Sequence, residues 1–220
     1  MYLCPFRPAL GRAQRLRMVN SSEVQSLINY SRIYYERGWM VATAGNLSVF
    51  DREIGELWIT SSGKHKGRLK EEDFICMNLD GKILRETTNK PSAEASIHQV
   101  IYRQIPSACA VLHVHTVTSC KLQFGIQKWH PATRFLLPNV EILKAFGDFR
   151  EEPNFSVIVT FNHGSVVDIS SDLENALRES SSDVPFFLIE NHGLTVWGKS
   201  VEDANKNLEA AEFILQVMLK

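Results

Sequence analysis

The stretch AVLHVHTVTS, residues 110–119, places two histidines in an otherwise apolar run that has the composition of a buried strand. Successive side chains of a strand point to opposite faces of a sheet, so His113 and His115 are expected to share one face while Val114 lies on the other. Two imidazoles on one face can bind the same metal ion, and imidazole is a common zinc ligand. The alternative is that both are ordinary polar residues of the core or its rim. The polar residues that follow, such as Thr116 and Ser119, favour a metal site.

The chain has 220 residues, of which 44% are hydrophobic and 22% charged, as in an ordinary globular protein. This length suits one domain, or at most two small ones. A net charge of −1 gives no electrostatic reason to expect a nucleic acid or an anionic membrane as partner. No apolar run approaches the ~18 residues that span a bilayer. The cysteines lack CxxC spacing and are expected to be buried apolar residues of a reduced, cytoplasmic protein: Cys4, Cys76, Cys109 and Cys120.

Residues 1–17 differ from the rest of the chain because they contain four arginines and no acidic residue. A transit peptide has such a composition, but this segment has two prolines, no serine and no apolar h-region. We therefore expect a disordered extension, or a translation start at Met18, followed by one domain over residues 18–220.

The periodicity of the remaining chain predicts alternating helices and strands. A helix is expected from a cap at Asn20 to a stop at Gly38, and Asp80-Gly81 is typical of a hairpin turn. The expected strands lie around residues 47–50, 57–60, 74–84 (a hairpin), 110–114, 155–161 and 184–190, and further helices begin at Pro91-Ser92 and near Ser200. The pattern indicates one α/β domain with helices flanking a central sheet.

A third histidine would complete an open catalytic zinc site, which typically has three protein ligands and one exchangeable position. The best candidate is His192, which follows the apolar strand FFLI and precedes a glycine in IENHGLTVWG. The other histidines are expected to be surface or hydrogen-bonded residues rather than ligands: His65, His98, His130 and His163.

Two loops rich in glycine and small polar residues, TAGN at 43–46 and TSSGKHKG at 60–67, lie beside predicted strands. Backbone N–H groups in such loops can bind a phosphate, although most loops of this kind are simply turns. The segment KPSAE at 90–94 places Ser92 at a helix N-terminus and Glu94 in the first turn. A carboxylate there is often only a partner of the helix dipole, but near a metal it can be a base or a fourth ligand.

Taken in order, the segments AGN, SSG, KPSAE, HVH and NHG resemble the motif series of the class II aldolase and adducin family, from about Val24 to the C-terminus. Within that family, GWMVATAGNLS, ITSSGKHKG and HGLTVWG are similar to the methylthioribulose-1-phosphate dehydratases of methionine salvage. These are lyases that remove water from 5-methylthioribulose 1-phosphate and yield 2,3-diketo-5-methylthiopentyl 1-phosphate.

The resemblance implies an αβα sandwich with a central, mostly antiparallel sheet, and a cytoplasmic homotetramer that acts on a small phosphorylated ketose. It implies one Zn²⁺ per subunit, held by His113, His115 and His192. The implied phosphate-binding residues are Asn46, Ser62, Gly63, Lys64 and Ser92.

Two glutamates are implied as catalytic. Glu141, in LLPNVEILKAFG, matches the segment in which the dehydratases carry their proposed catalytic glutamate, and Glu94 matches the catalytic glutamate of the aldolases. The chain departs from some relatives at Ala93, where they have a second serine, so one hydroxyl of the phosphate pocket is missing.

Three alternatives remain open at the level of sequence. The nearest is a sugar-phosphate aldolase or 4-epimerase of the same family. An adducin-like, non-catalytic interaction domain is disfavoured because it has no need of all three histidines. A structural zinc is disfavoured because structural sites are usually closed and rich in cysteine. The metal itself is also open, since imidazole suits iron, nickel and manganese as well as zinc.

Overall fold

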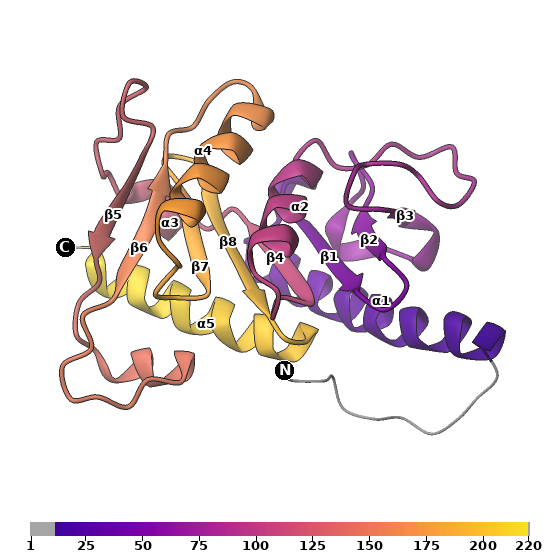
Figure 1. Cartoon of the computed structure of the whole chain (residues 1–220), viewed down its shortest axis with the longest axis horizontal. Coiled ribbons are helices and arrows are strands. Elements are labelled where there is room, and N and C mark those ends of the chain that lie inside the picture. Colours follow the sequence, from indigo (N-terminus) through magenta and orange to yellow (C-terminus); the bar gives the residue numbers. More distant parts are fainter. Residues whose placement is uncertain (1–11, 220) are drawn as a thin grey trace.

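An eight-stranded sheet forms the centre of the molecule in the computed structural model, which describes residues 12–219 and their side chains from residue 22 onward (Figure 1). The strand order is β3-β2-β1-β4-β8-β7-β6-β5. The strands are β1 (Asn46–Asp51), β2 (Glu56–Thr60), β3 (Phe74–Met77), β4 (Ala110–Val114), β5 (Ala132–Leu136), β6 (Ser156–Thr160), β7 (Phe186–Ile189) and β8 (Gly193–Gly198).

The pairing of the strands confirms the predicted, mostly antiparallel sheet. All neighbouring pairs are antiparallel except β6 and β7. The HVH strand, β4, lies in the interior of the sheet between β1 and β8. In this register His113 is opposite Asn46 on one side and Thr195 on the other.

Helices cover both faces of the sheet, as an αβα sandwich requires. One face carries α1 (Arg12–Glu36) and α5 (Val201–Met218), which lie below the sheet in Figure 1. The opposite face carries α2 (Ala95–Gln104) and α4 (Val166–Glu179), which contact each other. The short helix α3 (Val117–Lys121) follows β4 and contacts α5. The 3-10 segments are η1 (Val41–Thr43), η2 (Lys66–Arg68), η3 (Glu71–Asp73) and η4 (Glu141–Phe146).

The two apolar clusters follow from the side-chain alternation of the strands and the spacing of the helices. Leu112 of β4 packs with Leu27 of α1 and Leu208 of α5, whereas Val111 packs with Ile101 of α2 and Leu173 of α4. Neighbouring residues of one strand therefore contribute to opposite cores. The position of a residue along β4 therefore determines which pair of helices its side chain packs toward.

The first helix ends as predicted but begins earlier than predicted. Gly38 has φ of +73°, the left-handed conformation typical of a residue that stops a helix. The predicted cap at Asn20 is wrong, because α1 runs through that position from Arg12. Residues 12–17, a segment rich in strong helix formers, thus belong to α1, whereas residues 1–11 of the expected extension lie outside the described part.

Other predicted elements are present with small differences. The predicted hairpin at 74–84 has β3 as its first strand, but its return consists of a single bridge from Met77 to Ile83 after the Asp80-Gly81 turn. The last helix begins as expected, with the Ser200 hydroxyl accepting a hydrogen bond from the Asp203 N–H.

Of the cysteines in the described part, Cys76 is buried, and Cys109 and Cys120 are partly buried; Cys4 lies outside the described residues. No helix between residues 12 and 219 has the length and apolar character needed to cross a membrane.

Candidate metal centre

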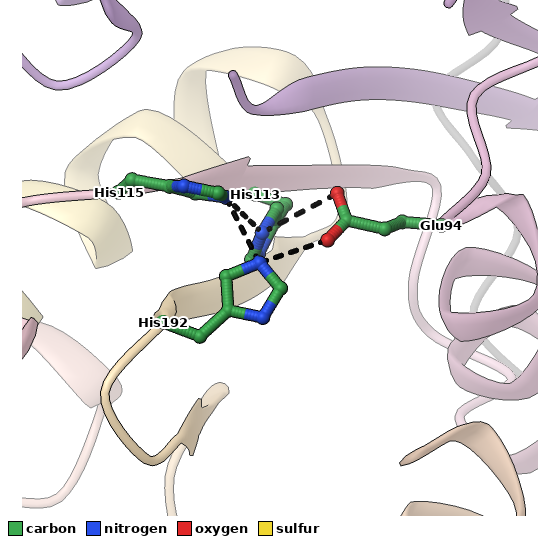
Figure 2. Close-up of side chains that lie close together, drawn as sticks. All are labelled: Glu94, His113, His115 and His192. Carbon is green, nitrogen blue, oxygen red and sulfur yellow. Dashed lines mark hydrogen bonds and ion pairs between the residues drawn. The ribbon is translucent and has the colours of Figure 1, made fainter. Parts of the chain in front are cut away.

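Four side chains from three separate parts of the chain converge beside the end of β4. Figure 2 shows the rings of His113, His115 and His192 close together, with the carboxylate of Glu94 facing them. One potential ligand atom from each residue lies within 4.8 Å of all the others. The Nε2 atom of His115 is 2.9 Å from Nε2 of His113 and 3.1 Å from Nε2 of His192. The structure thus brings the three histidines singled out from the sequence together with Glu94.

The position of each histidine follows from the sheet. His113 lies in β4 and is fully buried, whereas His115 follows the end of the strand and is held by a hydrogen bond from its N–H to the Trp39 carbonyl, 2.9 Å long. His192 lies in the tight turn between β7 and β8, after Asn191, whose φ is +57°.

The glycine of the NHG motif lets this turn approach β4. A Cβ atom on Gly193 would lie only 2.4 Å from the Val114 carbonyl oxygen, so a larger residue would push the turn away from β4. The glycine of the AGN motif meets the other side of β4 in the same way, because a Cβ atom on Gly45 would lie 2.8 Å from the His113 carbonyl oxygen. Both glycines therefore allow close packing around the histidine strand.

Glu94 is the N-cap residue of α2, yet its side chain makes no capping hydrogen bond. Its Oε1 lies 2.9 Å from Nε2 of His192, and its Oε2 lies 3.5 Å from Nε2 of His113. The side-chain amide of Asn46 also donates a hydrogen bond to Oε2. Of the two roles open for this carboxylate, partner of the helix dipole or neighbour of the metal, the geometry supports the second.

A second set of hydrogen bonds orients two of the histidines, His113 and His192, from the side away from the centre. Nδ1 of His113 is 2.8 Å from the Thr195 hydroxyl, and Nδ1 of His192 is 3.2 Å from the side-chain oxygen of Asn162. In both rings the other nitrogen, Nε2, faces the centre. Metal-binding histidines characteristically have such a partner on the second nitrogen, because it fixes the tautomer and the ring orientation.

His98 supports the centre through Asn46. It is buried in α2, with Nε2 hydrogen-bonded to the Asn46 side-chain oxygen and Nδ1 2.6 Å from the Ser48 hydroxyl. Burial lowers the pKa of His98 to about 3, so its ring is neutral at physiological pH. The amide of Asn46 is therefore held with its oxygen toward His98 and its nitrogen toward Glu94.

The remaining histidines behave as expected from the sequence. His65 and His130 are exposed, and the ring of His65 lies 4.5 Å from that of Tyr35, centroid to centroid. Nε2 of His163 is 2.7 Å from a carboxylate oxygen of Asp172. Within the described part of the chain, none of these belongs to the metal-ligating cluster.

The electrostatics of the centre suit a divalent cation. Burial, with the nearby rings of His113 and His192, lowers the pKa of His115 to about 3. For Glu94, burial alone raises the pKa, but His113 and His192 outweigh it and hold the pKa well below its usual range. Neutral imidazoles and an ionised carboxylate are the forms that bind a metal, so the residues present fit the group expected from the sequence.

The loops expected to bind phosphate lie side by side, because Ser61 forms a bridge with Pro91 and the Ser62 N–H donates to the Lys90 carbonyl at 2.9 Å. Ser62 and Gly63 are exposed, and Gly63 has φ of +71°. Ser92 is partly buried, and its hydroxyl accepts a hydrogen bond from the Glu94 N–H at 3.4 Å.

Two lysines of the GKHKG segment differ in their surroundings. Nζ of Lys64 lies 2.9 Å from a carboxylate oxygen of Asp73, and its side chain is partly exposed. Lys66, which the sequence reasoning missed, is 2% exposed, and burial lowers its pKa to about 8 although the carboxylates of Glu94 and Asp73 raise it. A loop sequence has no periodicity from which to tell the buried lysine from the exposed one.

Glu141 lies elsewhere on the same chain. It begins η4, which packs against α5 and lies below β5 and β6 in Figure 1, toward the edge of the sheet formed by β5. Its side chain is 82% exposed, and its Oε2 is 3.0 Å from Nζ of Lys144. Within the described chain it is not part of the cluster formed by the histidines and Glu94.

Glu190 is a second residue that sequence reasoning missed. It is 6% exposed and accepts hydrogen bonds from three successive backbone N–H groups, those of Phe124, Gly125 and Ile126, at 2.6–2.8 Å. It thereby ties the segment after α3 to the turn that carries His192. The sequence signal that could have pointed to Glu190 is its position in IENHG, directly after an apolar strand and two residues before a ligand candidate. An acidic residue at the end of a buried strand needs partners if it is itself buried.

Comparisons with known proteins agree with this geometry. Residues 25–219 match the family described as Class II Aldolase and Adducin N-terminal domain. The chain is 47% identical over 203 residues to a protein from Leptospira biflexa named methylthioribulose-1-phosphate dehydratase, a match that covers 90% of this chain and 97% of the relative. A protein of the same name from Microcystis aeruginosa is 39% identical over 196 residues, covering 88% of this chain and 93% of the relative.

Solved structures share the fold. An L-fuculose 1-phosphate aldolase superposes with a TM-score of 0.72 at 25% identity, covering 90% of this chain and 84% of that one. The L-fuculose-1-phosphate aldolase of Thermus thermophilus has the same fold, with a TM-score of 0.69 at 24% identity over 91% of this chain and 95% of that one. The protein therefore belongs to the class II aldolase and adducin family.

Proposed function

We propose that this protein is a zinc-dependent dehydratase that converts 5-methylthioribulose 1-phosphate to 2,3-diketo-5-methylthiopentyl 1-phosphate, a cytoplasmic step of methionine salvage. The observation that carries the proposal is the convergence of His113, His115, His192 and Glu94 in a chain that is 47% identical, over 90% of its length, to a protein named methylthioribulose-1-phosphate dehydratase.

Zinc is the metal we propose, held by the Nε2 atoms of the three histidines. Three nitrogen ligands with a carboxylate beside them match the ligand types of a catalytic zinc site. When bound, the ion would act as a Lewis acid toward the ketone oxygen of the substrate and stabilise negative charge there. The carboxylate of Glu94 already contacts two of the three histidines and the Asn46 amide, which suits it to complete the ligand set in the absence of substrate.

Proton transfer requires a further group that can both take up and release a proton. The C3 proton of the substrate lies α to the C2 ketone, and the C4 hydroxyl lies β to it, so removal of the first allows loss of the second as water. We propose that the Glu141 carboxylate takes the C3 proton and then protonates the departing C4 hydroxyl. Glu94 is less suited, because its pKa is held far below the physiological range in which a general base works best.

The position of Glu141 requires that it act on a neighbouring subunit, since its own chain keeps it away from the centre. We therefore propose that the protein forms a homotetramer in which Glu141 of one subunit reaches the centre of a neighbouring subunit. Four large apolar side chains are exposed in the segment from the start of α3 to the start of β6, which includes η4 and β5 at the edge of the sheet. Exposed apolar surface can mark a contact between proteins, and we propose that these side chains contribute to the subunit contacts. They are Val117, Trp129, Leu136 and Phe149.

The phosphate of the substrate is proposed to bind the adjoining loops that contain Asn46, Ser62, Gly63, Lys64 and Ser92. The bridge between Ser61 and Pro91 supports this role because it places the SSG and KPSAE loops next to each other and next to Glu94. Binding of this non-reacting end would fix the position of C3 relative to the centre.

A sugar-phosphate aldolase is the second candidate, favoured by the structural match to an L-fuculose 1-phosphate aldolase. The two reactions differ in the bond that is broken after the carbonyl is polarised. We expect the zinc-loaded protein to convert 5-methylthioribulose 1-phosphate to a phosphorylated diketone lighter by one water, as measured by mass spectrometry. Formation of dihydroxyacetone phosphate, or efficient turnover of fuculose 1-phosphate instead, would overturn the assignment.

A further inference from the structure

The ammonium group of Lys66 is a buried cation beside the metal centre. Its Nζ donates hydrogen bonds to the backbone carbonyls of Thr43, at 2.6 Å, and Lys64, at 3.1 Å. No carboxylate oxygen among the described side chains lies within 4 Å of it, and the nearby carboxylate of Asp73 forms an ion pair with Lys64 instead. A buried charge without an ion-pair partner is costly, and such charges are concentrated at functional sites.

The backbone around Lys66 holds its ammonium in one place. The Thr43 carbonyl belongs to the turn before the AGN motif, in which Ala42 and Thr43 have φ of +50° and +69°. On the other side, Gly67 packs so closely on α1 that a Cβ atom there would lie 2.7 Å from the ring of Tyr35. Lys66 thus links the AGN loop to the SSGKHKG loop, and the residue after it, Gly67, packs against α1.

The loop that Lys66 contacts also borders the metal centre, because a Cβ atom on Gly45, two residues after Thr43, would lie 2.8 Å from the His113 carbonyl oxygen. The Glu94 carboxylate, which faces the histidines, raises the pKa of Lys66 against the larger effect of burial. Lys64 is different, since it is paired with Asp73 and partly exposed. Of the two lysines in this loop, Lys66 is therefore the one without a carboxylate partner within 4 Å among the described side chains.

The same loop contains a buried polar group without a partner. The hydroxyl of Ser61, a residue 1% exposed, makes no hydrogen bond within the described part of the protein. Buried polar groups are nearly always hydrogen-bonded, and an exception often marks the place of a missing ligand. Ser61 directly precedes Ser62, one of the residues proposed to bind phosphate.

We propose that Lys66 is a substrate-binding residue whose ammonium donates its third N–H to an oxygen of the substrate's phosphate group. A lysine ammonium has three donors, of which the Thr43 and Lys64 carbonyls use two. A phosphate supplies the negative charge that the buried cation lacks, and its oxygens form strong hydrogen bonds with charged donors. The proposal rests on the proposed function for the presence of a phosphate in the substrate, but not on which bond the enzyme breaks.

The test uses inorganic phosphate as the probe and the zinc-loaded protein. We expect Lys66→Met to weaken phosphate binding, measured by isothermal titration calorimetry, by about tenfold to a hundredfold. Lys70→Met is the control, because Lys70 is an exposed lysine of the same region that pairs with Glu72, and it should change the affinity less than threefold. Zinc content should be unchanged in both variants, and KM for the phosphorylated substrate should rise more in Lys66→Met than kcat falls.

If Lys66→Met does not fold, Lys66→Gln replaces it, because its amide can still donate to the Thr43 carbonyl but carries no charge. The same loss of phosphate affinity is expected. Wild-type affinity in either folded variant would overturn the proposal. A fall in kcat with unchanged phosphate affinity would also overturn it, and would place the ammonium at the reacting oxygen instead. Because phosphate binding is measured without turnover, failure of the dehydratase assignment would leave this result interpretable.

Discussion

Oε1 of Glu94 lies 2.9 Å from Nε2 of His192, although the two residues are nearly one hundred positions apart in the sequence. Glu94 reaches the histidine from the N-terminus of α2, and His192 reaches the carboxylate from the turn between β7 and β8. The contact joins the KPSAE motif to the NHG motif. A metal ion bound at this centre would therefore have residues of both motifs around it.

The role of Glu94 can be separated from that of Glu141 by isosteric substitution. We expect Glu94→Gln to lower metal affinity by about tenfold to a hundredfold, because the carboxylate contacts two of the histidines. Glu141→Gln should leave the metal in place and lower turnover ~10²–10⁴-fold, the usual contribution of a general acid–base group. Metal titration and steady-state kinetics measure the two effects. Near-normal turnover in Glu141→Gln would show that it is not the proton-transfer residue.

Mixing two inactive variants tests whether Glu141 acts on a neighbouring subunit. His115→Ala removes the centre but keeps Glu141, and Glu141→Gln does the reverse, so hybrid oligomers would contain some complete sites. Co-refolded or co-expressed mixtures should regain a clear fraction of wild-type turnover. Each variant mixed with itself is the control. Hybrids confirmed by mass spectrometry that stay inactive would contradict action between subunits.

Buried neutral histidines should make the stability of the metal-free protein fall in weak acid. The pKa values of His98 and His115 are lowered to about 3, so below pH 6.5 these histidines take up protons in the unfolded chain but not in the folded one. The free energy of unfolding should therefore fall from pH 6.5 to pH 5, by about 1.4 kcal/mol per pH unit for each fully titrating histidine.

Urea unfolding at several pH values measures this slope. His98→Gln should reduce the slope by removing one of the two groups, while His130→Gln, at an exposed position, should leave it unchanged. A slope that is the same in wild type and His98→Gln would contradict the assignment of a neutral, buried ring to His98.

Glu190 is expected to contribute to stability more than an ordinary acidic residue. Its carboxylate accepts three backbone N–H groups, and Gln would offer only one acceptor oxygen and place donors against those N–H groups. Glu190→Gln should lower the free energy of unfolding by about 2–3 kcal/mol in urea titrations. The control is Glu209→Gln, which breaks an exposed pair with Arg37 and should cost under about 1 kcal/mol. Equal losses would show that the three hydrogen bonds do not stabilise the fold.

The sequence predicted the histidines of the centre well because strand geometry constrains them. Alternation along β4 gives His113 and His115 a shared face, and a histidine between a buried strand and a glycine indicates the turn that carries His192. The sequence could not show which partner Glu94 meets, because a position at a helix N-terminus does not fix where its side chain points. The answer depends on the pairing of β1 with β4, which places Asn46 opposite His113.

Side chains in the loops were the least predictable part. The side-chain amide of Asn46, a residue proposed to bind phosphate, also contacts Glu94 and His98, and these contacts arise only once β1, α2 and β4 are packed together. Lys64 and Lys66 are two residues apart in a segment without regular structure, so burial of the second is decided by the packing of Gly67 on α1. The start of α1 was also placed too late, because the local capping signal at Asn20 is overridden by a helix that continues through it.

The metal content of the purified protein tests the central claim most directly. Protein prepared without chelator and analysed by elemental mass spectrometry should contain about one divalent ion per chain, zinc by our proposal. His115→Ala should lose most of that metal, whereas His65→Ala, at an exposed histidine outside the cluster, should retain it. Equal metal content in wild type and His115→Ala would contradict a metal centre built from His113, His115, His192 and Glu94.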